Sequence, residues 1–203
     1  MDYNGNIGGI NLVGNIYITM MPLIFAGIFN MIFTKTNLYK KNKFPIDLGK
    51  YFVDGKRLFG DNKTYIGFIS MIIFCLIFQV IWGIFCKYFG FENSNELYLI
   101  FDNTIHFNIL VGVLFGFTYM ICELPNSFIK RRINIVPGKT DKGLKGILFF
   151  IIDQIDSLIG VFFVLMLLNG MSLSRYFLYL FIGALTHIII NLILFCLKIR
   201  RNV

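Results

Sequence analysis

Five long apolar stretches restrict the fold of this sequence more than any other feature. They cover approximately residues 16–33, 66–86, 105–122, 147–168 and 176–197. Each is close to the roughly 20 residues that an α-helix needs to cross the hydrocarbon core of a bilayer. Apolar residues are continuous within them and do not alternate with polar ones, which argues against a membrane β-barrel. We therefore expect an all-α integral membrane protein, with residues 1–203 forming a single transmembrane domain of about five transmembrane helices.

The composition agrees with a bundle in lipid. Hydrophobic residues make up 57% of the chain, whereas soluble chains average about 45–50%. No lysine or arginine precedes the first stretch, so the basic region of a cleaved signal peptide is missing and we expect this helix to be retained. The net charge is +8, but no soluble module is left to bind nucleic acid, so we expect no nucleic-acid partner.

The distribution of charge predicts the orientation in the membrane. Residues 34–65, 123–146 and 198–203 carry 17 of the 19 lysine and arginine side chains. Basic loops tend to stay in the cytosol, which predicts an N-terminus outside and a C-terminus in the cytosol. We expect a multi-pass protein of the cell membrane with cytosolic loops at about 34–65 and 123–146. Their basic side chains could bind anionic headgroups, an anionic substrate or both.

The first cytosolic loop contains residue types that bind phosphate. Its aspartates, Asp47, Asp54 and Asp61, are spaced seven residues apart among glycines. Glycine, lysine and threonine together can cradle a phosphate group, and Thr64 could cap the second long helix. A basic loop that contacts lipid headgroups is the alternative, but the three carboxylates favour a functional site. The basic residues between them are Lys50, Lys56, Arg57 and Lys63.

The second cytosolic loop carries a basic triplet, Lys130, Arg131 and Arg132. If the segment is helical, Ser127 and Lys130 share one face. The triplet could neutralise a polyphosphate, with arginine donating to two oxygens at once. The alternative is a basic cluster that only stops membrane translocation.

Two aspartates within the fourth apolar stretch are the most informative residues. Asp153 and Asp156 stand at i and i+3, and therefore on one helix face. A carboxylate at the centre of a membrane helix costs about 2.5–3.5 kcal/mol, and two that lie close together repel each other. Mg²⁺ would satisfy both, since it typically uses one or two carboxylates plus substrate phosphates. Ion pairs with Lys142, Lys145 or the basic triplet are the alternative.

These three groups of residues are the parts of a phosphoryl or nucleotidyl transfer site. They combine carboxylates for Mg²⁺, cations for phosphates and glycines for close approach, in a reaction where catalysis is mostly positioning and charge stabilisation. No Ser-His-Asp or Cys-His set is apparent. The sequence therefore predicts transfer of a phosphorus group rather than acyl-enzyme chemistry.

At these residues the chain resembles the CDP-archaeol synthase family, membrane cytidylyltransferases related to the bacterial phosphatidate cytidylyltransferases. The matching motifs occur in the family's order, and the resemblance covers about residues 43–160. One departure is Cys122-Glu123, where the family has Gly-Asp; Glu123 keeps a carboxylate there. The motifs are residues 45–49, 54–57, 60–64 with Gly67, 127–132 and 153–156.

The resemblance implies that CTP reacts with an unsaturated archaeal ether-lipid phosphate to give a CDP-lipid and pyrophosphate, with Mg²⁺ as cofactor. It implies that Asp153, Asp156 and Glu123 bind the metal and that Lys130 joins the two aspartates in catalysis. The lipid stays open between an archaeol-type phosphate, a phosphatidate and a polyprenyl-type phosphate. The residues expected to bind substrate phosphates or to shape their pocket are Arg57, Asp61, Lys63, Thr64, Ser127, Arg131 and Arg132.

Three alternatives remain at this stage. A CDP-alcohol phosphotransferase also has an early Asp-Gly, but Asp54-Gly-Lys-Arg lacks that family's continuation. A small transporter would place its charges near the bilayer midplane, often in repeated halves, and no repeat is visible here. A non-catalytic membrane scaffold is the third. A homo-oligomer is compatible with the sequence.

Overall fold

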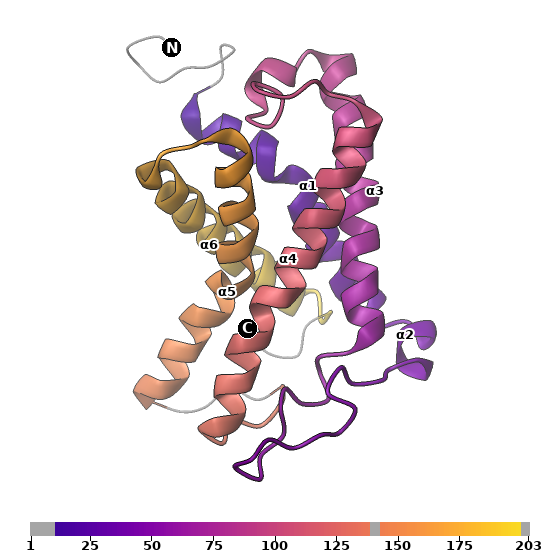
Figure 1. The fold of residues 1–203 in the computed structure, drawn as a ribbon, viewed down its shortest axis with the longest axis vertical. Coiled ribbons are helices and arrows are strands. Elements are labelled where there is room, and N and C mark those ends of the chain that lie inside the picture. Colours follow the sequence, from indigo (N-terminus) through magenta and orange to yellow (C-terminus); the bar gives the residue numbers. More distant parts are fainter. Residues whose placement is uncertain (1–10, 139–142, 200–203) are drawn as a thin grey trace.

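A computed structural model describes residues 11–138 and 143–199, and within them the protein is helical (Figure 1). Among these residues no β-strand occurs, only isolated bridges in the loop before α3. All five long helices are long and apolar enough to cross a membrane, which confirms the expected fold class. The elements are α1 (Leu12–Phe33), α2 (Asn37–Lys41), α3 (Tyr65–Phe89), the 3₁₀ helix η1 (Glu92–Ser94), α4 (Ile105–Arg132), α5 (Gly143–Asn169) and α6 (Leu173–Cys196).

Polar side chains fix where four of the long helices begin. Asn11 Oδ1 accepts from Gly14 N at 2.8 Å at the start of α1. Thr64 Oγ1 accepts from Gly67 N at 3.1 Å at the start of α3, which confirms the cap predicted from the sequence. Thr104 and Ser172 cap α4 and α6 in the same way. Each cap satisfies a backbone N–H that the first helical turn leaves unpaired.

Small residues hold α4 at the centre of the bundle, between α3 and α5. A Cβ on Gly112 would lie 2.5 Å from Leu76 Cα, and one on Gly116 would lie 2.5 Å from Ile72 Cα, so the backbones of α4 and α3 are in close contact. On the other side, Gly160 of α5 lies directly against Cys122 of α4. Glycines at these positions let membrane helices approach closely.

The outer surface of α3 is apolar, as a lipid-facing surface should be. Four isoleucines at intervals of four residues form a row, and 41–54% of each side chain is exposed. Such an exposed apolar row is typical of a protein surface that meets membrane or a partner. The four residues are Ile69, Ile73, Ile77 and Ile81.

The second of the two predicted loops begins later than the sequence predicted. Residues 123–132 were expected in the loop, but they form the last turns of α4, which continues through Pro125. The helix ends at Arg132, the φ of Asn134 two residues later is left-handed at 64°, and Ile135 N donates to Lys130 O at 2.9 Å. This is the usual hydrogen bond that closes a helix at such a residue. The polar residues of this segment therefore sit on a rigid helix.

Candidate active site

Two polar faces meet where the C-terminal part of α4 passes the N-terminal part of α5. On α4 the polar residues are Glu123, Asn126, Ser127 and Lys130, at the spacing of one helix face. Opposite them, α5 carries Asp153 and Asp156. The expectation that Ser127 and Lys130 share a face is met, since both lie within α4.

Contacts across this interface involve both aspartates. Lys130 Nζ donates to both carboxylate oxygens of Asp153. Asn126 Nδ2 donates to Asp153 Oδ1 and to Asp156 Oδ2, each at 2.6 Å. The two carboxylates are thus bound by an ammonium and an amide from the facing helix.

The ion-pair alternative raised by the sequence holds in part. Lys130 of the basic triplet pairs with Asp153, whereas Lys145 Nζ donates to the Ile133 carbonyl at 2.6 Å. Lys142 lies outside the described residues. Sequence reasoning did not select Asn126, although its position one turn before Lys130 on the same face was the available signal.

Lys63 brings the first loop to the same polar face. Its ammonium donates to Glu123 Oε2. Burial alone would lower the pKa of Lys63, but the neighbouring Glu123 carboxylate raises it above its usual value. The ion pair with Glu123 thus favours the charged form of Lys63 on the polar face of α4.

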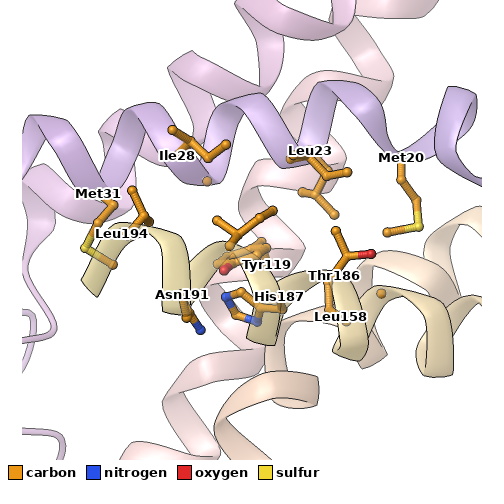
Figure 2. A pocket seen from close by; sticks show the side chains of 14 residues that line it. Met20, Leu23, Ile28, Met31, Tyr119, Leu158, Thr186, His187, Asn191 and Leu194 are labelled. Carbon is orange, nitrogen blue, oxygen red and sulfur yellow. The ribbon is translucent and has the colours of Figure 1, made fainter. Parts of the chain in front are cut away.

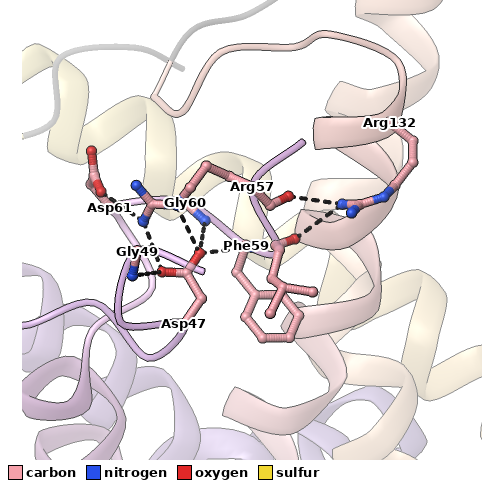
Figure 3. A network of polar contacts seen from close by, with 8 residues as sticks. Asp47, Gly49, Arg57, Phe59, Gly60, Asp61 and Arg132 are labelled. Atoms are coloured by element: carbon pink, nitrogen blue, oxygen red, sulfur yellow. Dashed lines mark hydrogen bonds and ion pairs between the residues drawn. The ribbon is translucent and has the colours of Figure 1, made fainter. Parts of the chain in front are cut away.

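Asp47 organises the first loop (Figure 3). Its carboxylate accepts hydrogen bonds from Gly49 N at 3.1 Å, Phe59 N at 3.0 Å and Gly60 N at 2.9 Å. Arg57 Nη2 donates to it at 2.7 Å. Burial by itself raises the pKa of Asp47, but Arg57 and the three backbone N–H groups bring it well below its usual range. The backbone of the loop is therefore arranged around this buried carboxylate.

The other two spaced aspartates also bind basic residues of the protein. Asp61 Oδ1 accepts from Arg57 Nη2 at 2.9 Å, and Asp54 Oδ2 pairs with Arg132 Nε at 3.1 Å. The seven-residue spacing therefore builds the structure of the loop. It does not bring the three carboxylates to one ligand.

The neighbours Arg131 and Arg132 differ in their contacts. Arg132 Nη1 donates to Arg57 O at 2.9 Å and to Leu58 O at 3.3 Å, and its guanidinium lies 3.6 Å from the centre of the Phe128 ring. Arg131 Nε and Nη1 are shielded from solvent, and within the described part of the chain they have no hydrogen-bond partner. Arg132 thus attaches the loop to α4, while Arg131 keeps donors for another group.

Two further predicted residues are buried. Thr64 is 1% exposed; besides its capping bond, its hydroxyl lies 2.9 Å from the Tyr39 hydroxyl. Ser127 is 8% exposed on the polar face of α4. Thr64 is engaged in the local fold, whereas Ser127 lies among the site residues of α4.

An apolar cleft lies between α1 and α6 (Figure 2). Leu23 and Ile28 line it from α1, and Leu194 from α6. Its inner wall includes Tyr119 of α4, one helical turn before Glu123, and Leu158 of α5, two residues after Asp156. The cleft therefore reaches the parts of α4 and α5 that neighbour the acidic residues in the sequence.

The donor set at the aspartates fits a small oxygen-binding cation. Among the residues described, no group of three or more His, Cys, Asp or Glu side chains could hold a metal ion. Two carboxylates on one helix face nevertheless meet the need of Mg²⁺, which takes its remaining ligands from water and substrate phosphates. A buried amide oxygen of Asn126 lies in the same cluster without a partner.

Comparison with known sequences gives one family. A family model described as CarS-like, CDP-archaeol synthase, matches residues 10–203. A CDP-archaeol synthase of Sulfurisphaera tokodaii is 30% identical over 189 residues, which cover 89% of this chain and 98% of that protein. A CDP-archaeol synthase of Methanocaldococcus jannaschii is 37% identical over 118 residues. This second match spans 57% of the chain and 58% of the relative.

A solved structure shares the fold. It is described as an intramembrane enzyme for archaeal membrane lipids biosynthesis, and it superposes with a TM-score of 0.59 at 20% sequence identity. The match covers 87% of this chain and 92% of that one. The five-helix arrangement is thus that of a known membrane protein.

Proposed function

The chain belongs to the CDP-archaeol synthase family, and on that premise we propose that it transfers the cytidylyl group of CTP to an archaeol-type ether-lipid phosphate. The products are a CDP-activated lipid and pyrophosphate. The observation that carries the proposal is the match of the family model to residues 10–203. The facing carboxylates and cations of α4, α5 and the first loop support it.

We assign Arg131, Lys63 and Lys130 to binding the triphosphate of CTP. Arg131 carries two shielded N–H donors without a partner in the described chain, and guanidinium binds phosphate oxygens in pairs. Lys63 and Lys130 lie beside the aspartates and can turn towards an arriving phosphate. Ser127, on the same face of α4, is a further phosphate contact.

The remaining predicted residues stabilise the loop before α3 and are not assigned to contact substrate. Arg57 and Asp61 are bonded to each other, Arg132 is bonded to the loop carbonyls, and Thr64 caps α3. We assign them to holding the loop against α4, so that Lys63 and Arg131 are correctly placed.

Asp153 and Asp156 would hold a divalent cation, Mg²⁺ by preference. The bound ion supplies charge neutralisation on the triphosphate. Glu123 as a third ligand stays a prediction, because in the structure its carboxylate is paired with Lys63.

The lipid would reach the site along the apolar cleft between α1 and α6. The hydrocarbon chains would lie against its apolar wall, and the phosphate would point to the turn of α4 that follows Tyr119. The lipid phosphate oxygen attacks the α-phosphorus of CTP, and the bond from this phosphorus to the bridging oxygen of the β-phosphate breaks. The electron pair of that bond leaves with pyrophosphate, so the cations are needed where negative charge accumulates.

The charged end of the bundle is proposed to face the cytosol. The loop before α3, the end of α4 and the beginning of α5 lie at the same end of the molecule (Figure 1). This end carries most of the basic residues, which supports a cytosolic position.

The test is pyrophosphate release by the purified full chain in detergent with CTP and Mg²⁺. The lipid panel contains an unsaturated archaeol-type phosphate, phosphatidic acid and a polyprenyl phosphate. Release that requires both CTP and the ether-lipid phosphate, and that is lost in Asp153→Asn but kept in Asp102→Asn, supports the proposal. Folded protein that releases no pyrophosphate with any lipid would leave a transporter or scaffold in its place.

A further inference from the structure

Asn126 is a buried side chain of α4 in which only one half of the amide group is bonded. Its Nδ2 donates to Asp153 Oδ1 and Asp156 Oδ2, both at 2.6 Å. The residue is 6% exposed, and its Oδ1 accepts no hydrogen bond from any residue in 11–138 or 143–199. Buried polar atoms almost always have a partner. The unbonded oxygen therefore calls for a donor or a cation.

The chemistry of the surrounding groups favours a cation. Two carboxylates and an amide oxygen are hard oxygen donors of the kind that Mg²⁺ and Mn²⁺ prefer. The amide nitrogen already touches both carboxylates, so the oxygen on the same carbon lies within the same small cluster. The oxygen and nitrogen of an asparagine amide differ little in shape. One side chain can therefore either donate to the two carboxylates or place an oxygen beside them.

We infer that Asn126 is a cation-binding residue of this chain. Its N–H groups hold Asp153 and Asp156 together when no cation is bound, and the amide turns its oxygen towards a divalent cation that the two carboxylates hold. The inference rests on the proposed function, because it takes the two aspartates as the cation site. Lys130 supports the same arrangement: a cation on Asp153 would replace its ammonium, which is then available to substrate phosphate.

The experiment measures binding of Mn²⁺ alone, without nucleotide or lipid. Free Mn²⁺ is followed by electron paramagnetic resonance on the full chain in detergent, and thermal unfolding is recorded with and without Mn²⁺. The variants are Asn126→Leu, Asn126→Asp and Asp153→Asn. Asn108→Leu is the matched control, because Asn108 is a buried asparagine of the same helix, 2% exposed, in the network with Gln79 and Tyr98.

Asn126→Leu is expected to weaken Mn²⁺ binding about 10- to 100-fold, the usual loss when a metal site loses one supporting group. Asn126→Asp is expected to keep Mn²⁺ binding, because it retains an oxygen. Without Mn²⁺, its third carboxylate repels the other two. Its unfolding temperature should therefore rise more on adding Mn²⁺ than that of the wild type. Asn108→Leu should bind Mn²⁺ as the wild type does.

Three outcomes overturn the inference, and they are distinguishable. If Asn126→Leu binds Mn²⁺ as the wild type does and Asp153→Asn loses binding, Asn126 is not a cation-binding residue, but the proposed cation site at the aspartates stands. If Asn126→Asp binds Mn²⁺ as weakly as Asn126→Leu, only the N–H groups of Asn126 contribute to binding and its oxygen does not. If Asn126→Leu does not fold, loss of Mn²⁺ binding in folded Asn126→Asp leads to the same conclusion. Unchanged binding in Asp153→Asn overturns the cation site of the proposed function and the role of Asn126 with it.

Discussion

Lys63 and Glu123 form an ion pair that joins the loop before α3 to the polar face of α4. The two residues are sixty positions apart in the chain, and both side chains are about four-fifths buried. The pair therefore fixes where the loop lies against the two aspartates of α5. It also holds the Lys63 ammonium at the site.

Removing Lys63 should affect both folding and turnover. Lys63→Met leaves the Glu123 carboxylate buried without a partner, which we expect to destabilise the protein by about 3 kcal/mol. The double variant Lys63→Met/Glu123→Gln should regain much of that stability but no activity, if Lys63 also binds phosphate. Thermal unfolding and pyrophosphate release measured on the same samples separate the two effects. Recovery of activity in the double variant would limit Lys63 to a structural role.

Arg131 and Arg132 should respond to substitution in opposite ways. Arg131→Met removes donors that have no partner in the described chain, so stability should change little while KM for CTP rises about 10- to 100-fold. Arg132→Met removes the bonds to the Arg57 and Leu58 carbonyls and the contact with Phe128, so thermal stability should fall. Equal effects of the two variants on KM and on unfolding temperature would contradict the assignment.

The Asp47 carboxylate makes the stability of the first loop depend on acid. Its pKa in the folded protein lies below the usual value of 3.8, so its contribution is fully present above about pH 4 and is lost as the pH falls further. Asp47→Asn, which cannot ionise, should be less stable than the wild type by roughly 3 kcal/mol at neutral pH. The difference in unfolding temperature between the two proteins should shrink below pH 4. A difference that is constant from pH 3 to pH 7 would show that the charge of Asp47 is unimportant.

A side chain at Gly160 should separate the two helices of the site. Gly160→Leu places atoms where Cys122 and Thr118 already lie, and overpacking of this kind costs about 1–3 kcal/mol. We expect lower thermal stability and also lower turnover, because Asp153 and Asp156 move away from α4. Gly27→Ala is the control for stability, since a Cβ at Gly27 would meet nothing within 4 Å.

Membrane orientation can be tested with cysteines at exposed positions of the two ends. Leu48, 62% exposed in the first loop, and Tyr88, 82% exposed near the end of α3, are suitable sites. In a background without the native cysteines, a membrane-impermeant maleimide added to intact cells should label Tyr88→Cys and not Leu48→Cys. Disrupted membranes should allow both to react. The reverse pattern in intact cells would place the site outside.

The sequence predicted the membrane helices and the paired aspartates because both depend on local spacing. A run of apolar residues has only a few stable solutions in lipid, and an interval of three places two carboxylates on one face whatever surrounds them. The same rule placed Ser127 beside Lys130. The Thr64 cap was predictable for the same reason.

The contacts between distant segments were not predictable in this way. Arg132 resembles a phosphate ligand in the sequence, and only the folded chain shows that it binds the carbonyls of Arg57 and Leu58. Asp47 resembles a ligand too, but the turn of the loop surrounds it with backbone N–H groups. Asn126 was missed because its importance comes from two side chains on the next helix. The apolar run ends at Cys122, so it did not show that α4 continues through Pro125 to Arg132.

The close packing of α4 between α3 and α5 has a consequence for how a lipid enters and leaves. Gly112 and Gly116 bring α4 into backbone contact with α3, and Gly160 brings α5 against the Cys122 side chain of α4, so these three helices are closely packed. The cleft lies elsewhere, between α1 and α6, which pack mainly on α3 and α5 respectively. Separation of these two outer helices would widen the cleft enough for a bulky hydrocarbon chain to enter from the side. Such a movement of α1 and α6 at each turnover would leave α4, α5 and the carboxylates in place.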